Sequence, residues 1–141
     1  MTREPIYAAL LAKLAAAANY NTASRRFKMF TDVAPPDLPA LFVLQKDEVA
    51  QTVPGMNTVW TIQCEAVIYA NVSGDPNVAA SSTLNPLLDA VEAALAPSPV
   101  TNKQTLGGLV QHCTIAGAIR IDETINGDRM IAVVPIEIKV A

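Results

Sequence analysis

The chain has 141 residues, of which 51% are hydrophobic; this is the length of one domain and excludes a disordered chain. Its formal net charge of −3 argues against a nucleic-acid-binding domain, because such domains are generally basic. No stretch reaches the roughly 18 uninterrupted apolar residues of a membrane span. We therefore expect one folded domain over residues 1–141, with neither nucleic acid nor membrane as a direct partner.

An amphipathic helix is the first element expected, and it should end near residues 19–21. Thr2 can cap its start. Glu4 and Lys13 interrupt its apolar run, which favours a helix of the folded protein over a signal peptide. Apolar side chains recur along it at the spacing of one helical face: Ile6, Leu10, Leu14 and Ala17.

Three strands are predicted next. Basic and apolar residues alternate over residues 25–30, and a proline-rich connection separates this strand from a short apolar strand over residues 40–44. After a turn at residues 53–57, a long strand covers residues 58–70. One face of the long strand is apolar and should be core, whereas the other is half polar and should meet water or a partner. The half-polar face carries Thr61, Gln63, Glu65, Val67 and Tyr69.

A second helix is predicted from Ser81 or Ser82 to Leu95, with a stripe of leucines on one side. Pro86 lies inside this range. If Ser82 or Thr83 caps the helix, Pro86 falls in the first turn, where its missing N–H destabilises little. Both predicted helices are then available to pack on one face of a sheet.

A closing hairpin is predicted at the end of the chain. A strand over residues 109–124 should bend or bulge at Gly117, and Asn126-Gly127 is a strong signal for a type I′ turn. The return strand covers residues 129–140. Pro135 within it should sit at a bulge or where its nitrogen faces no partner strand. The fold class expected is α+β, in the order α-β-β-β-α-β-β, with a mainly antiparallel sheet.

The residues that could take part in catalysis do not form a recognisable catalytic set. His112 is the only histidine, and Cys64 and Cys113 are the only cysteines. Neighbouring residues on a strand point to opposite faces, so His112 and Cys113 cannot form a nucleophile pair. The cysteines lack the spacing of a zinc site and are best interpreted as free buried thiols, although a disulfide between neighbouring strands stays open. We predict no catalytic residue, cofactor or metal.

One basic cluster and two acidic pairs are the candidates for interaction. The basic cluster fits an edge strand protected by charge, an electrostatic subunit interface or a nucleic-acid site, of which the last conflicts with the acidic net charge. The acidic pairs fit solvated charges or the counterpart of the basic cluster. The candidate interface residues are Arg25, Arg26, Lys28, Asp47, Glu48, Asp122 and Glu123.

Several segments, taken in order along the chain, resemble those of a known protein family. They are the helix with IYAALL (6–11) leading to RRF (25–27), the strand PALFV (39–43), the long strand over 60–69, the helix LNPLLDA (84–90), and LGGLV (106–110) before the closing hairpin. In this order they resemble the tail terminators of tailed bacteriophages, also called minor tail or tail completion proteins. The resemblance covers nearly the whole chain.

The resemblance implies a structural virion protein that is not an enzyme. Such proteins form a ring, generally hexameric, that caps the tail tube, stops its polymerisation and provides a docking surface for head-completion proteins. The resemblance also implies that this protein is made in the host cytoplasm and lies in the virion, at the head-proximal end of the tail. Alternatives are another neck or tail protein, such as a head–tail connector or tube subunit, and a small-molecule-binding or enzymatic α+β domain around His112.

Overall fold

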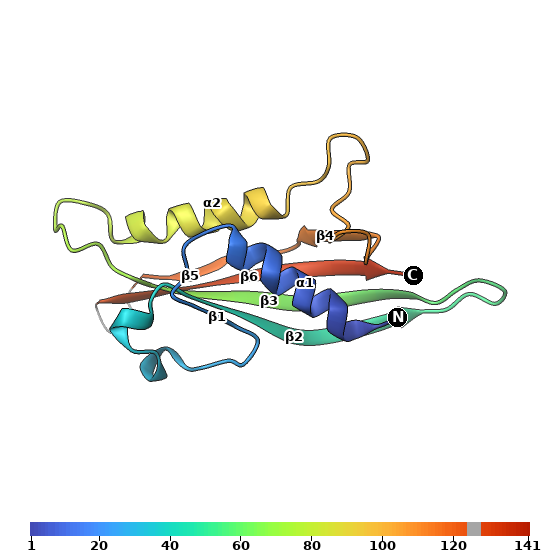
Figure 1. Ribbon diagram of the computed structural model, residues 1–141, viewed down its shortest axis with the longest axis horizontal. Helices are drawn as coiled ribbons and strands as arrows, with labels where there is room; N and C mark the ends of the chain where they lie inside the picture. Colours follow the sequence, from blue (N-terminus) through green and yellow to red (C-terminus); the bar gives the residue numbers. More distant parts are fainter. Residues whose placement is uncertain (124–127) are drawn as a thin grey trace.

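The computed structural model describes residues 1–123 and 128–141 and has an α+β fold, as predicted. Two helices lie on one face of a six-stranded, mainly antiparallel sheet (Figure 1). The predicted Asn126-Gly127 turn lies outside the described residues. The helices and strands are α1 (Arg3–Ala16), β1 (Thr22–Ser24), β2 (Ala40–Gln51), β3 (Val59–Asn71), α2 (Asn85–Ala94), β4 (His112–Ile115), β5 (Arg120–Asp122) and β6 (Arg129–Val140).

The sheet has the strand order β1-β2-β3-β6-β4, and β5 also pairs with β6. Among the described strands, β1 and β2 form the one parallel pair. β3 and β6 form the centre of the sheet and pair over nearly their whole lengths, from Trp60 opposite Val140 to Asn71 opposite Arg129. Because β4 and β5 both pair with β6, they form one interrupted edge on the side of the sheet opposite β1.

The main core lies between the two helices and one face of the sheet. Leu10 and Leu14 of α1 are fully buried there, as is Leu84 at the start of α2. The apolar face predicted for the long strand packs against them through Ile62, Cys64, Ala66, Ile68 and Ala70. The period-two pattern of β3 and the helical period of α1 therefore meet in one core, as the sequence indicated.

A second, smaller core lies on the opposite face of the sheet. Phe42, Val67 and Tyr69 are buried there beneath Val33 and Leu38 of the proline-rich connection. The ring centroids of Phe42 and Tyr69 are 5.6 Å apart, and those of Phe27 and Phe42 are 5.8 Å apart. Residues 25–39 thus cover part of the face that was predicted to be half polar.

The prediction of a strand over residues 25–30 is wrong. The strand in this region is β1, three residues earlier, and it is fixed by backbone and side-chain hydrogen bonds of Asn21 to Pro39 and Leu38 (2.9 Å and 2.8 Å). Phe27 and Phe30 pack onto the sheet face without belonging to a strand: Phe27 contacts the ring of Phe42, and Phe30 begins a 3-10 turn that packs on the second core. Tyr69 holds this segment by donating a hydrogen bond from its hydroxyl to the carbonyl of Lys28 (2.8 Å).

Other boundaries also differ from the predictions. β2 extends to Gln51 across a bulge between Gln45 and Glu48, so the charged residues after position 44 belong to the strand. α2 begins only at Asn85, after a separate 3-10 turn at Ala80–Thr83, and this places Pro86 in its first turn as expected.

The predicted strand over residues 109–124 is split at Gly117. Gly117 has φ +112°, and a Cβ atom there would lie 3.4 Å from Pro135 Cγ. The carbonyl of Pro135 accepts a hydrogen bond from the N–H of Ala116 (3.0 Å). The missing N–H of Pro135 therefore faces the break between β4 and β5, which confirms the position predicted for this proline.

Candidate functional site

The seven predicted interface residues divide into those used within the subunit and those left on its surface. Arg25 is used internally. Its guanidinium forms an ion pair with Glu4, donates a hydrogen bond to Gln45 (3.3 Å) and lies over the ring of Tyr7 (5.5 Å to the centroid). The hydrogen bond from Arg25 lowers the pKa of Glu4 below its ordinary value of 4.5. Arg25 therefore joins α1 to the edge of the sheet.

Glu48 is also used within the subunit. It accepts a hydrogen bond from Arg3 Nε (2.7 Å) and another from the Tyr7 hydroxyl (3.2 Å). The guanidinium of Arg3 in turn lies over the ring of Trp60, 5.2 Å from the centroid. Burial raises the pKa of the Tyr7 hydroxyl to about 12, so Tyr7 remains a neutral donor to Glu48. These contacts fasten the start of α1 to β2 and β3.

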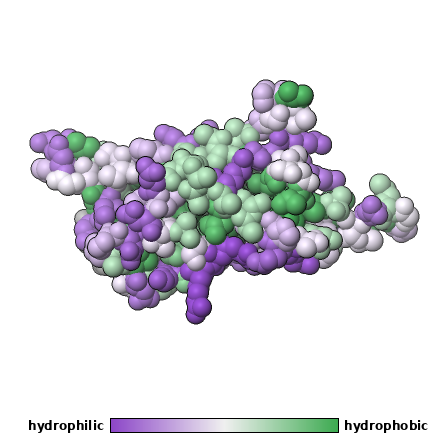
Figure 2. All heavy atoms as spheres, viewed as in Figure 1, coloured by the Kyte–Doolittle hydropathy of each residue, from purple (hydrophilic) through white to green (hydrophobic). Residues whose placement is uncertain are grey.

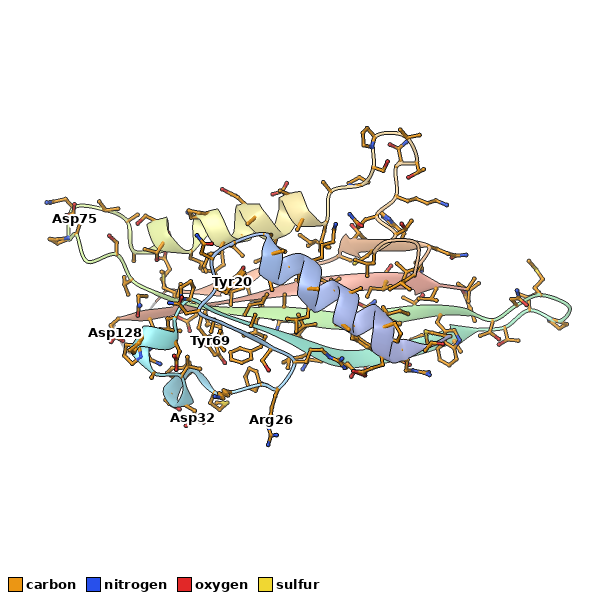
Figure 3. The ribbon with its side chains drawn as sticks, in the orientation of Figure 1. Tyr20, Arg26, Asp32, Tyr69, Asp75 and Asp128 are labelled. Carbon is orange, nitrogen blue, oxygen red and sulfur yellow. The ribbon has the colours of Figure 1, made fainter. Side chains whose placement is uncertain are left out.

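Arg26 and Lys28 remain exposed, while their backbone is held in place. The N–H of Arg26 donates to Ser24 Oγ (2.9 Å), and the carbonyl of Lys28 accepts from Tyr69. Figure 3 shows the Arg26 side chain directed away from the body of the molecule. These two residues thus form a fixed basic surface beside β1 and β2.

Asp47 is exposed within the bulge of β2, and Asp122 and Glu123 are exposed at the end of β5. Asp122 pairs in register with Ile131 of β6, on the side of the sheet opposite β1. Asp47 instead lies on β2, the strand that pairs with β1 beside the basic surface. The acidic candidates are therefore divided between the two sides of the sheet.

Both edges of the sheet have open stretches. β1 pairs with β2 only from Ala40 to Phe42, so residues 43–51 of β2 have no second neighbouring strand among the described residues. In the part of the chain that the structure describes, β5 pairs with β6 alone. Beside this open edge, the side chains of Ile119 and Ile121 are 40% and 48% exposed. Apolar side chains at an unpaired edge are unusual for a protein that works as a monomer.

Further exposed apolar side chains lie on projections from the body. The hairpin that joins β2 to β3 extends from one end of the molecule, and the loop between α2 and β4 extends from the helical side (Figure 1). Val53 and Met56 on the hairpin are 54% and 71% exposed, and Val100 on the loop is 89% exposed. Apolar atoms are visible on both projections in Figure 2. The sequence analysis interpreted these residues only as turn and loop; apolar residues within turn segments were the signal that it missed.

The uncovered part of the second sheet face is polar and internally paired. The Gln63 side-chain amide donates to Glu137 (2.9 Å), and Lys139 Nζ donates to Thr61 Oγ1 (3.1 Å). Beside these pairs lies a shallow depression of about 180 Å³. It is lined by Glu65, Gly117, Ala118, Arg120, Val133 and Pro135.

The residues considered for catalysis are kept apart. His112 Nδ1 accepts a hydrogen bond from the backbone N–H of Gln104 (3.1 Å), and Cys113 is fully buried in the main core on the opposite face. Cys64 and Cys113 are free, as expected, and β6 lies between their strands. Within residues 1–123 and 128–141, no group of three or more His, Cys, Asp or Glu is arranged to hold a metal ion.

Both thiols should be unreactive in the native protein. Burial raises the pKa of Cys64 and of Cys113 from 9.0 to about 12, and the reactive species is the thiolate. A thiol–disulfide exchange reagent at neutral pH should label both cysteines only after unfolding; rapid labelling of the folded chain would contradict the burial. Folding raises these pKa values. The contribution of the two protonated thiols to the free energy of unfolding is therefore complete below pH 9.0 and is lost as the pH rises towards 12.

Comparisons with known proteins leave the function to be argued from the structure. A scan against protein-family models finds no matching family, and a search of curated proteins finds no similar sequence. In the part of the chain that the structure describes, no helix is both long and apolar enough to cross a membrane.

Proposed function

We propose that this chain is the ring-forming subunit of a bacteriophage tail terminator, as its sequence resemblance implies. In this role several copies, six by the resemblance, form a ring on the end of the tail tube, stop its polymerisation and present a surface to head-completion proteins. The ring belongs to the virion, at the head-proximal end of the tail. The work is done by protein–protein contacts, without chemical turnover.

One observation carries the proposal: exposed apolar side chains gather at the periphery, on the β2–β3 hairpin, on the loop before β4 and at the β5 edge. Exposed apolar surface of this kind marks sites of protein–protein contact. A ring needs two different surfaces on each subunit, because each copy meets its neighbour head to tail. Figure 1 places the hairpin and β5 towards opposite ends of the molecule, which suits such an arrangement.

The packing within the subunit also suits an assembly role. The contacts of Arg3 and Arg25 fasten α1 to the sheet, and the second core fastens residues 25–39 to the opposite face. Interfaces of pre-organised proteins form with little backbone movement. A rigid body with projecting apolar segments can therefore dock without first ordering a large part of its chain.

The experiment that tests this function is electron microscopy of tails assembled in cells that lack the protein. Tails longer than normal, without attached heads, are the result expected for a terminator. If no tubes form, the chain is a tube subunit; if tubes of normal length stay separate from heads, it is a head–tail connector. Tails of normal length joined to heads would exclude all three structural roles.

A further inference from the structure

We propose that the open edge of β5 in one copy pairs with the open edge of β2, residues 43–51, in a second copy of this chain. The two sheets would then continue into each other. This inference rests on the proposed ring and names the contact that would build it. The partner is a second copy because the chain itself supplies both halves of the contact, on opposite edges of its sheet.

The backbone of β5 is available for such pairing. Pro135 directs its carbonyl towards β4, where it accepts from Ala116. Alternate residues of a strand direct their polar backbone atoms to the same side, so Val133 and Ile131 form hydrogen-bonded pairs with Arg120 and Asp122. The N–H and C=O groups of Ile121, between these pairs, therefore point to the open edge.

The side chains at this edge also favour a neighbouring strand. Ile121 is paired with Ala132, which is fully buried on the helix-covered face. Ile121 thus belongs to the core-facing side of the sheet, yet it is 48% exposed. A second copy would bring Ala50 of β2 and the first turn of α1 to this face and cover Ile121.

Charge complementarity selects the partner edge. Arg26 lies beside the point where β1 stops pairing with β2, since neighbouring Arg25 reaches Gln45 of β2. Lys46 follows on the same edge, but it forms an ion pair with Glu65 of its own subunit (3.7 Å) and stands next to the exposed Asp47. At the other edge, β5 ends with Asp122, and the exposed Glu123 follows it. The exposed Arg26 thus places a positive charge beside the start of the open β2 edge, and Glu123 places a negative charge just after the end of β5.

The same charges fix the direction of pairing. In an antiparallel pair the start of one strand lies opposite the end of the other, so Arg26 of one copy meets Glu123 of the next. Within one subunit β5 runs antiparallel to β2, because each of the steps β2 to β3, β3 to β6 and β6 to β5 reverses the direction. A copy rotated about a ring axis that runs along the strands keeps its strand direction and its helical face. In such a ring the pairing of β5 with β2 is antiparallel.

The first test is a charge exchange measured by analytical ultracentrifugation of the full chain. Arg26→Glu and Glu123→Lys should each weaken association by roughly tenfold, since each replaces attractions between surface charges by repulsions. The double variant should recover most of the wild-type association, because the pair is restored with reversed signs. Asp89→Lys, an acidic-to-basic change on the exposed side of α2, is the matched control and should leave association unchanged.

The second test places thiols across the proposed contact, which is practicable because Cys64 and Cys113 are buried. Lys46→Cys with Glu123→Cys should give a ladder of disulfide-linked oligomers. Lys46→Cys with Ile119→Cys, the pair that parallel strands would bring together, should not.

Several results would overturn the edge pairing: a chain that stays monomeric throughout, a dimer closed through two β5 edges, or a ring that ignores these substitutions. A ring that ignores them leaves the terminator function intact and places its contact elsewhere. An edge-paired oligomer from a protein whose loss leaves tails unaltered would instead contradict the terminator function alone.

Discussion

Phe42→Ala is expected to lower the free energy of unfolding by about 3–5 kcal/mol, because it removes a large, fully buried ring. Phe42 has no exposed surface and contacts the rings of Phe27 and Tyr69 in the second core. That core holds residues 25–39 on the sheet, so the variant should also release the segment that carries Arg26 and Lys28. Denaturant unfolding gives the loss of stability, and hydrogen exchange reports the released segment.

Phe42→Leu is the control for this substitution, because it keeps most of the apolar volume and should lose less than about 1.5 kcal/mol. If hydrogen exchange in residues 25–39 is as slow in Phe42→Ala as in the wild type, the second core does not hold the basic segment. Oligomers of Phe42→Ala should be weakened even where the chain remains folded, because Arg26 would then no longer have a fixed position.

Leu10→Ala is the second substitution with a large expected effect, a loss of about 2–5 kcal/mol of stability. Leu10 is fully buried where α1 crosses the sheet, whereas the neighbouring Leu11 is only half-buried at the margin of the same core. Leu11→Ala makes the same chemical change on the same helix and should lose much less. Thermal or denaturant unfolding measures the loss of stability in each of the two variants. Equal losses would mean that α1 does not pack as described.

The helices and central strands could be predicted because their apolar residues follow a clear period. The stripe of Ile6, Leu10 and Leu14 and the alternation from Trp60 to Ala70 both face the main core. The same reasoning failed at residues 25–30. Phe27 and Phe30 there reach the sheet without belonging to a strand, and Met29 is exposed, so the alternation of basic and apolar residues does not mark a buried strand face.

The candidate site was less predictable than the fold. Charged residues stand out in the sequence, but their partners depend on which elements cross in space. Arg25 meets Glu4 and Glu48 meets Arg3 only because α1 lies over β2. By contrast, Gly117 and Pro135 marked the break in the edge strand correctly, since one lacks a side chain and the other lacks an N–H. The exposure of Ile119 and Ile121 follows from that break and from where the helices end.

The mass of the purified native chain, measured alone and with the tail tube protein of the same virus, tests the proposed function most directly. We expect a discrete closed oligomer of about six copies, either from the chain alone or once the tube protein is present; closed rings of this kind follow from head-to-tail contacts. The addition of the chain should also stop further growth of the tube protein. A chain that stays monomeric in both conditions and leaves tube growth unchanged would contradict the proposal that it is a ring-forming terminator.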